Sequence, residues 1–213
     1  CSSPSRETRS RNASAAPIRE ARRVAMMNMV AAGMAVVAAV RVAERLGPDD
    51  LVVVLLPDGG RQVIDFRLPG DFMGLRSVLL RTSDHSFAAV TDIVVAEVSG
   101  RRMIASFHEL PRLGAAILWA ASRDEAMVVE HLVGIGRRSA LVRTAHLLIE
   151  LGLRLQLVGL SDESGFDCPL NQYLLADALG LTAIHVNRVL RQLRERKLLT
   201  FRDGRVVFHD LPR

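Results

Sequence analysis

Cysteine is scarce in this chain of 213 residues, which contains only Cys1 and Cys168. Two cysteines allow at most one disulfide, and sparse cysteine use is typical of proteins from a reducing compartment, so we expect a cytoplasmic location. Their spacing gives no indication of a zinc site or an iron–sulfur cluster. The histidines are isolated as well. We therefore expect no metal site and predict that His85, His108 and His131 are surface or packed side chains.

Motifs for catalysis are also missing. The sequence has no serine–histidine–aspartate signature, no metal-ligand spacing, and no GxxxxGK[ST] loop of the kind that cradles phosphates. Carboxylates cluster in RDE (123–125) and SDES (161–164). These stretches fit a helix surface and a polar loop, where charged side chains are usually solvated. We therefore expect neither an enzyme nor a bound cofactor.

The composition is that of a globular protein with an excess of positive charge. The hydrophobic fraction is 49% and the charged fraction 24%, and the formal net charge is +5. The length is sufficient for one or two domains with hydrophobic cores. A basic chain of this kind favours an anionic partner.

The first 50 residues form an atypical segment rich in Ala and Arg. Residues 1–23 carry six arginines, and an uncharged stretch follows from Val24 to Val40. Three interpretations stay open. The stretch is a signal peptide or membrane anchor, because a basic segment precedes an apolar one; or it is a buried or partner-facing helix; or residues 1–50 are a misread or rearranged coding segment, because the composition changes abruptly near Asp49–Leu51.

Residues 51–108 are expected to form a small β-rich unit. The apolar run LVVVLL (51–56), the turn signal PDGG (57–60) and the alternating RQVIDF (61–66) predict a hairpin. Residues 87–98 predict one or two further strands. We interpret SGRR (99–102) as a turn and MIASF (103–107) as a short strand.

A long helical pattern follows, with apolar residues at three- and four-residue spacing. Gly134 and Gly136 are expected to divide it into two helices. The first helix, 114–137, is too apolar for a lone surface helix, so we expect it to pack against a second copy of the chain. Packing on its own β-rich unit is the alternative.

Residues 138–213 contain a helix-turn-helix pattern. After a polar loop at 159–168, two short helices are followed by a predicted hairpin with its turn at Asp203-Gly204. The spacing of a small residue, a turn glycine and two branched apolar residues fits a helix-turn-helix unit: Ala176, Gly180, Val186 and Val189. Thr182 is placed to cap the second helix.

The second helix, 182–194, is expected to present a DNA-reading face. Its apolar stripe (Val186, Val189, Leu190, Leu193) packs inward when the helix is projected at 100° per residue, and Ile184, Arg188 and Arg191 lie opposite. Arg188 can make a bidentate bond to guanine, Ile184 suits a thymine methyl, and His185 and Asn187 shape the site. We expect phosphates to be held by Thr182, Arg191, Arg202 and Arg205. The alternative is a solvated amphipathic helix with a charged outer face.

Three stretches resemble the Crp/Fnr family of bacterial transcription regulators. IDFRLPGDFMGLRSVLL (64–80) is similar to the part of the family's β-roll that leads into its short phosphate-cassette helix. RTAHLLIELGLRL (143–155) resembles the helix after the hinge, and residues 171–208 resemble the DNA-binding domain of a subgroup with an HVNR recognition helix. Arg188 falls where the family places its guanine-reading Arg, and Ile184 falls where many members carry a Glu.

The resemblance implies an α+β fold. It consists of a partial cyclic-nucleotide-binding-like β-roll at 51–113, a long dimerisation helix at 114–137, and a winged helix-turn-helix domain at 138–213. It also implies a homodimer that reads a two-fold symmetric site in double-stranded DNA, with RNA polymerase as a candidate partner. A small-molecule sensor whose main output is not DNA binding is the alternative.

The effector is unknown, and cyclic AMP is not expected. Members that bind it carry a Glu after Gly-Asp/Glu-Phe-x-Gly and a later Arg-Ser pair for the phosphate. Here Leu75 follows Gly74, and the later pair is His85-Ser86. Without the Arg a cyclic phosphate loses its main charge-assisted contact. Substitution by Arg76 or Arg81 stays open.

Overall fold

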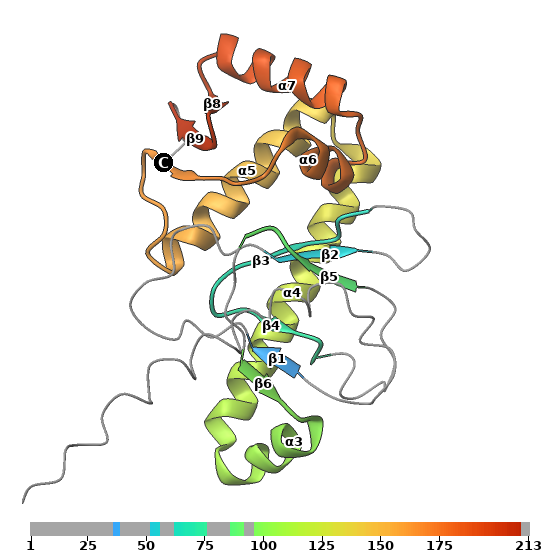
Figure 1. Ribbon diagram of the computed structural model, residues 1–213, viewed down its shortest axis with the longest axis vertical. Coiled ribbons are helices and arrows are strands. Elements are labelled where there is room, and N and C mark those ends of the chain that lie inside the picture. Colours follow the sequence, from blue (N-terminus) through green and yellow to red (C-terminus); the bar gives the residue numbers. More distant parts are fainter. Residues whose placement is uncertain (1–35, 39–51, 56–61, 76–85, 92–95, 210–213) are drawn as a thin grey trace, which may run out of the picture.

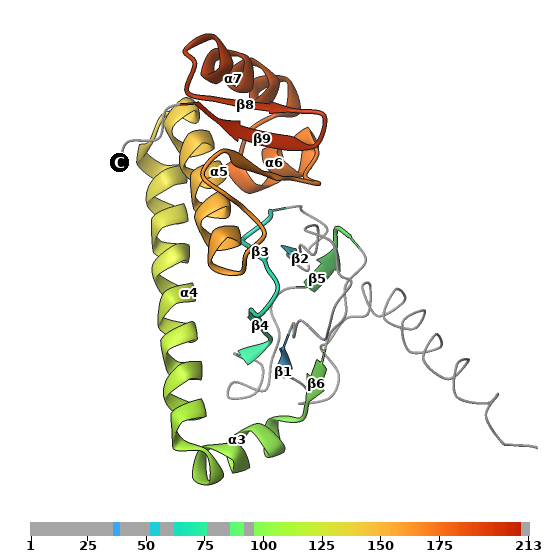
Figure 2. The same cartoon turned by 90° about the vertical axis from the view of Figure 1, so that its left-hand side faces the viewer.

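The computed structural model describes residues 36–38, 52–55, 62–75, 86–91 and 96–209. Within these ranges a β-rich unit lies beside one long helix, and a helical unit with a small sheet sits at the far end of that helix (Figures 1 and 2). The strands of the β-rich unit are β1 (Val36–Ala38), β2 (Val52–Leu55), β3 (Phe66–Arg67), β4 (Phe72–Met73), β5 (Ser86–Ala89) and β6 (Ala96–Val98).

The described strands of this unit pair into two antiparallel sheets, with orders β4-β1-β6 and β3-β2-β5. The two stretches pair antiparallel as predicted, with Val53 opposite Phe66, but the second strand (β3) begins only at the last residue of the predicted 61–66. The predicted turn between them lies outside the described residues. The two strands expected within 87–98 are β5 and β6.

The segment of residues 1–50 is described only at Val36–Ala38. These three residues form β1, which pairs with both β4 and β6. The interpretation of residues 24–40 as a helix is therefore wrong at these positions, and the rest of the segment lies outside the described residues. In the described part of the chain, no helix combines the length and the apolar character that a membrane span requires.

The predicted turn and strand at 99–107 are wrong, because this stretch is helix α3 (Gly100–Glu109). Ser99 caps the helix, with its hydroxyl accepting a hydrogen bond from the Arg102 amide. Met103 is buried against Ile117 of the next helix. A short apolar run does not by itself distinguish a strand from a helix, and here the serine cap and this contact decide.

Helix α4 (Pro111–Arg137) begins earlier than the predicted 114 and ends at the expected residue. The expectation that Gly134 and Gly136 break the helix is wrong, because both lie inside it. The break comes at Arg138 and Ser139, where Ser139 adopts an extended conformation and caps α5 (Ala140–Leu157) through the Val142 amide. A serine cap rather than a glycine therefore determines where the two helices part.

The C-terminal unit has one core and one sheet. Its remaining elements are β7 (Gly165–Asp167), α6 (Gln172–Leu179), α7 (Ala183–Glu195), β8 (Leu199–Arg202) and β9 (Arg205–Phe208). The sheet order is β7-β9-β8, and the β8–β9 hairpin confirms the predicted one. Its core is continuous with Val63, Phe66 and Leu68 of the β-rich unit.

Strand β7 lies inside the stretch predicted as a polar loop. Gly165 has φ 145°, and a Cβ there would lie 1.9 Å from the Val206 carbonyl oxygen. Only glycine fits this approach to β9. The prediction failed because the strand has only three residues and its partner lies far along the chain.

Six alternating charged side chains join the β-rich unit to α4 and α5. We call them the ionic ring: Asp65, Arg67, Asp124, Arg123, Asp71 and Arg154. Arg154 of α5 contacts Asp65 at 3.0 Å and Asp71 at 2.9 Å. Arg123 contacts Asp71 at 2.6 Å and Asp124 at 3.2 Å. Arg67 closes the ring by pairing with Asp124 and with Asp65.

Arg154 is the most buried cation of the ring, with 8% of its surface exposed. It also donates to the Phe66 carbonyl at 2.7 Å and contacts Glu150 at 3.3 Å. Burial opposes its charge, but the surrounding carboxylates outweigh burial and raise the pKa of Arg154. Burial likewise opposes ionisation of Asp71, yet the charge of Arg154, the Leu68 amide and Arg123 lower the pKa of Asp71.

Loss of Arg154 is expected to destabilise the fold strongly. Arg154→Met keeps much of the packing but removes from Asp65 and Asp71 the more buried of the two cations that each contacts, so the free energy of unfolding should fall by about 3–5 kcal/mol. Because the pKa of Asp71 is lowered in the fold, its contribution is present above its unfolded pKa and is lost as the pH falls through its folded pKa. The variant should therefore lose less stability on acidification than the wild type.

Urea unfolding at neutral and acid pH measures both effects. The matched control is Arg101→Met, because Arg101 is exposed at the start of α3, and it should change stability by no more than about 0.5 kcal/mol. Equal stabilities for the Arg154 and Arg101 variants would contradict the role given to the ring.

Two glycines of the helices should respond in opposite ways to alanine. A Cβ on Gly152 of α5 would lie 2.9 Å from the ring of Phe208 and 3.2 Å from that of Phe166, so Gly152→Ala should destabilise by about 1–3 kcal/mol. A Cβ on Gly136 of α4 meets nothing within 4 Å. Gly136→Ala should therefore stabilise by up to about 1 kcal/mol. Urea midpoints compare the two, and a loss of stability in both would contradict the open surroundings of Gly136.

Candidate nucleic-acid interface

The turn between α6 and α7 has the predicted geometry. Asn171 caps α6 by accepting from the Tyr173 and Leu174 amides. Gly180 ends α6 in the left-handed conformation, with φ 59° and ψ 43°. Thr182 then caps α7 (Ala183–Glu195), its hydroxyl accepting from the His185 amide at 3.2 Å. The chain is thereby redirected within three residues, which is what a helix-turn-helix requires.

The predicted apolar stripe of α7 is buried. Val186, Val189, Leu190 and Leu193 all belong to the core shared with α5 and α6. Ala176 of α6 is also buried, where its small side chain allows close packing. Burying four branched side chains along one stripe fixes the rotation of α7 about its own axis, and so determines which residues face outward.

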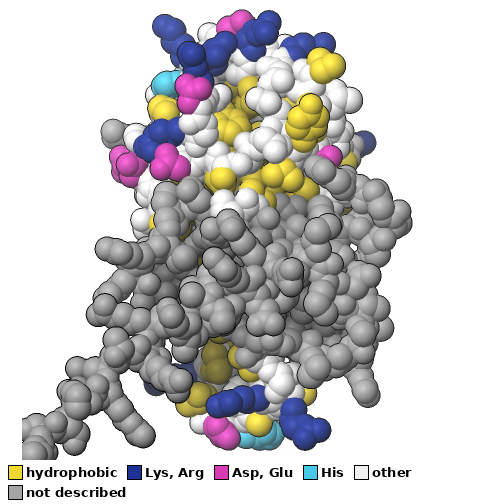
Figure 3. All heavy atoms as spheres, viewed as in Figure 1, with side chains coloured by type: hydrophobic (Ala, Val, Ile, Leu, Met, Phe, Trp, Pro, Cys, Tyr) yellow, Lys and Arg dark blue, Asp and Glu magenta, His cyan; other side chains and the backbone are white. Residues whose placement is uncertain are grey.

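The outer face of α7 carries the predicted reading residues. Ile184 is 83% exposed, although it is a large apolar side chain. Asn187, Arg188 and Arg191 are exposed, and His185 is half-buried. Among the ion pairs of the described residues, none involves Arg188 or Arg191. Figure 3 shows arginine and lysine side chains gathered over the end of the molecule formed by α7.

The hairpin after α7 places the other two predicted arginines. Its turn at Asp203 and Gly204 has φ values of 51° and 75°, as a two-residue hairpin loop requires. Arg202 is exposed and contacts Asp203 at 3.3 Å. Arg205 is half exposed, and its guanidinium donates to Asp167 at 2.7 Å.

Asp167 and Asn171 help to form this surface but were not identified from the sequence. Asp167 holds Arg205 but lies 38 residues away, in a stretch predicted to be a loop, so no local signal reveals the pair. The role of Asn171 could have been predicted from the sequence, because an Asn just before a helical pattern is a typical N-cap. Tyr173, next to this cap, is an exposed aromatic side chain on the same unit.

The described residues contain no group of three or more His, Cys, Asp and Glu side chains that could hold a metal ion. His108 is exposed, and His131 is packed between helices and hydrogen-bonded. The residues discussed for cyclic AMP (Arg76, Arg81 and His85) lie outside the described part of the chain.

Comparisons with known proteins identify the kind of domain that contains α6 and α7. Residues 142–213 match the model of the Crp-like helix-turn-helix domain. The chain is 35% identical over 161 residues to the nitrogen fixation regulation protein FixK of Rhizobium meliloti, covering 72% of this chain and 66% of FixK. It is 30% identical over 148 residues to the transcriptional activatory protein AadR of Rhodopseudomonas palustris, covering 68% of this chain and 59% of AadR.

The chain thus spans slightly less than two thirds of the length of these curated relatives. Among solved structures it is similar to FixK2 of Bradyrhizobium japonicum, with a TM-score of 0.70 and 24% identity over 87% of both chains. This likeness confirms the expected fold class: an α+β fold with a cyclic-nucleotide-binding-like β-unit, a long helix and a C-terminal helix-turn-helix. The chain belongs to the Crp/Fnr family.

Proposed function

We propose that this protein is a sequence-specific DNA-binding transcription regulator that acts as a homodimer. The observation that carries the proposal is the outer face of α7, where Arg188, Asn187 and the apolar Ile184 are exposed while the opposite face is buried. A solvated surface helix would not need an exposed isoleucine at its first turn. A helix that enters the major groove has a use for it, because thymine presents a methyl group there.

In this proposal α7 is the recognition helix. Arg188 donates two hydrogen bonds to a guanine, Ile184 contacts a thymine methyl, and His185 and Asn187 shape the neighbouring positions. Phosphate contacts come from Thr182, Arg191, Arg202 and Arg205. The free guanidinium of Arg188 supports its role, since no carboxylate among the described residues has to be displaced first. Arg205 instead exchanges part of its pairing with Asp167 for a phosphate.

The two-fold symmetry of the DNA site requires two copies of the chain. Helix α4 supports this, because it leaves large apolar side chains exposed along its length: Leu118 and Leu132 are each 69% exposed, and Trp119 is 64% exposed. We propose that residues 114–137 pair with the same residues of a second copy. Two recognition helices would then meet half-sites about one helical turn of DNA, roughly 34 Å, apart.

The same proposal assigns the other domains of the chain, its location and its protein partner. Residues 51–113 form a sensor-like β-roll to which β1 (Val36–Ala38) adds a strand, residues 138–213 form the DNA-binding domain, and the remainder of residues 1–50 is an atypical segment. We propose a cytoplasmic protein without catalytic activity. When it is bound to DNA, RNA polymerase is its candidate protein partner. The named relatives support this, since one is a regulation protein and another a transcriptional activatory protein.

The proposal is tested by selecting DNA from a random pool with the full chain at two salt concentrations. An enriched inverted repeat is the expected result, with binding that weakens steeply as salt rises because phosphate contacts release counterions. Salt-sensitive binding without enrichment would contradict sequence-specific reading. Binding that barely responds to salt would instead favour a small-molecule sensor whose main output is not DNA.

Arg188→Ala should weaken binding to the selected site by about 1–3 kcal/mol and leave binding to random DNA nearly unchanged, because a base contact is lost. Arg205→Ala is the comparison, since a phosphate contact should weaken binding to both DNAs alike. Titration of each variant against both DNAs gives the four affinities. A sequence-selective loss in the Arg205 variant would contradict its assignment.

A further inference from the structure

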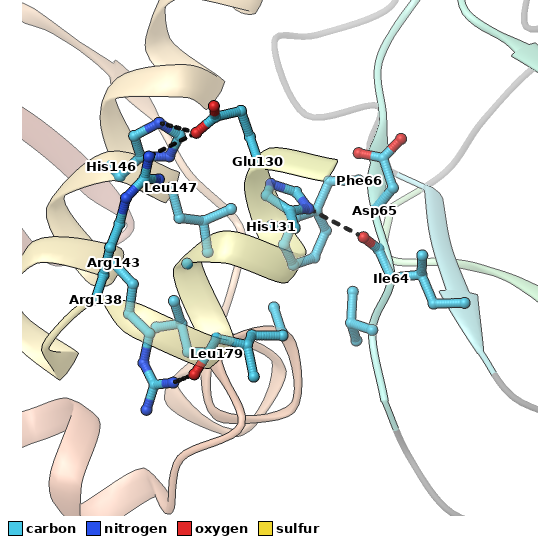
Figure 4. A pocket seen from close by; sticks show the side chains of 14 residues that line it. Ile64, Asp65, Phe66, Glu130, His131, Arg138, Arg143, His146, Leu147 and Leu179 are labelled. Carbon is cyan, nitrogen blue, oxygen red and sulfur yellow. Dashed lines mark hydrogen bonds and ion pairs between the residues drawn. The ribbon is translucent and has the colours of Figure 1, made fainter. Parts of the chain in front are cut away.

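The C-terminal end of α4 meets the β-rich unit and the DNA-binding unit at a small cleft that is open to solvent. The cleft is lined by residues 63–66, by the last turns of α4, and by parts of α5 and α6. His131 of α4 points across it toward the backbone of Ile64 (Figure 4). The histidine side chain is 21% exposed, so it is mostly buried but keeps some contact with solvent.

Both ring nitrogens of His131 face hydrogen-bond acceptors. Nδ1 lies 3.2 Å from the Ile64 carbonyl oxygen, and Nε2 lies 2.9 Å from Oε2 of Glu150. A carbonyl oxygen can only accept, so Nδ1 must carry a hydrogen. An ionised carboxylate can also only accept, so Nε2 must carry one as well. A neutral imidazole has a single N–H, and the geometry therefore fits the doubly protonated ring.

These two bonds join three separate parts of the chain. Ile64 belongs to the segment of residues 62–66 that leads into β3, His131 belongs to α4, and Glu150 belongs to α5. The same segment also touches the helix-turn-helix, because the Val63 amide donates to the Asp177 carbonyl of α6 at 3.3 Å. A change in the pairing of His131 therefore acts where the β-rich unit contacts all three helices.

Other charged groups around His131 come from each packed element. On α5, Glu150 also contacts Arg154 at 3.3 Å, and on the β-rich segment Asp65 contacts Arg154 at 3.0 Å. Glu130, the neighbour of His131 on α4, is held by Arg138 at 2.6 Å and lies 3.8 Å from His146. Arg143 of α5 donates to the Ile135 carbonyl. On α6 the nearby ionisable residue is Asp177, whose backbone carbonyl makes the contact with Val63.

We propose that His131 is a proton-dependent clasp between the β-rich unit and the helices that carry the DNA-binding unit. While doubly protonated, the ring ties the Ile64 carbonyl to Glu150. When it loses a proton, one nitrogen lone pair faces an acceptor oxygen, and one of the two bonds is replaced by repulsion. The clasp concerns contacts within one chain, so it stands whether or not the protein binds DNA.

The pKa directions agree with this geometry. The hydrogen bond to Glu150 raises the pKa of His131 against the opposing effect of burial, with further support from the Glu150 charge and the Ile64 carbonyl. Burial opposes ionisation of Glu150, but His131 and Arg154 outweigh it and lower the pKa of Glu150. Because the folded pKa of His131 is raised, its contribution is fully present below its unfolded pKa and is lost as the pH rises through the folded pKa.

The first test is NMR of the full chain with ¹⁵N-labelled histidine. Both nitrogens of His131 should have the shifts of protonated ring nitrogens while the ring contacts Ile64 and Glu150, and His131 should lose its proton at a higher pH than a histidine of the unfolded chain, because its pKa is raised in the fold. In Glu150→Gln the titration of His131 should move to lower pH, because the charged acceptor is gone. A titration of His131 at or below that of a histidine in the unfolded chain, or a ring with only one N–H below that titration, overturns the proposal.

The second test is the thermal midpoint of unfolding, measured between about pH 6 and pH 9. This range starts near the ordinary pKa of histidine and extends upward, because the pKa of His131 is raised in the fold. The wild type should lose stability over this range, and His131→Gln, which keeps an N–H donor but has no titrating proton, should lose clearly less. His108→Gln is the control for the removal of a histidine as such, since His108 is exposed at the end of α3 and lies outside the cleft. Parallel profiles for the wild type and His131→Gln would overturn the clasp. The NMR titration decides if His131→Gln does not fold.

Discussion

The burial of one arginine is the constraint on which the arrangement of the three parts depends. Arg154 is a side chain of α5, the first helix of the C-terminal unit, yet most of its partners belong to the β-rich unit. A buried guanidinium cannot be left without partners, because its desolvation costs several kcal/mol. The β-rich segment must therefore present Asp65, Asp71 and the Phe66 carbonyl to α5. The long helix is bound into the same arrangement through Arg123 and Asp124.

The ionic ring lies beside a hydrophobic contact between the same parts of the chain. Val63, Phe66 and Leu68 belong to the same core as the leucines of α5 and the buried stripe of α7. The apolar contacts supply non-directional attraction, and the ionic ring and His131 supply direction. Figure 2 shows the consequence for the whole chain: α5 runs alongside the C-terminal part of α4, and α6, α7 and the β8–β9 hairpin lie near that end of the long helix.

The parts that could be predicted from the sequence are those specified locally. The helix-turn-helix was located residue by residue, because its cap at Thr182, its left-handed Gly180 and its apolar stripe lie within a short stretch. The same holds for the hairpin turn at Asp203-Gly204. Some errors concern local caps that were overlooked, since Ser99 begins α3 and Ser139 begins α5. Others fall where distant residues decide. Strand β7 exists because Gly165 accepts the close approach of β9, and α3 is a helix because Met103 packs against Ile117.

The ionic ring could not have been predicted in this way. From the sequence, IDFRLPGD was identified only as part of a stretch similar to the Crp/Fnr family, and RDE (123–125) was predicted to be a solvated helix surface. The structure places Asp65, Asp71, Arg123 and Asp124 in one network instead. Nothing in the spacing of either motif indicates that the two meet, since 52 residues separate Arg123 from Asp71. The reading residues of α7 are exposed as expected, and their contacts with DNA remain predictions.

The division of α7 into a buried stripe and an exposed face has a consequence for how such a protein can change over evolutionary time. The residues that keep the helix in place are not those that would touch a ligand, so substitutions on the outer face leave the fold largely untouched. Ile184 illustrates this freedom, because its side chain is almost entirely outside the core. Whatever this face binds, its surface chemistry can therefore change by a few outer-face replacements at little cost to the stability of the fold.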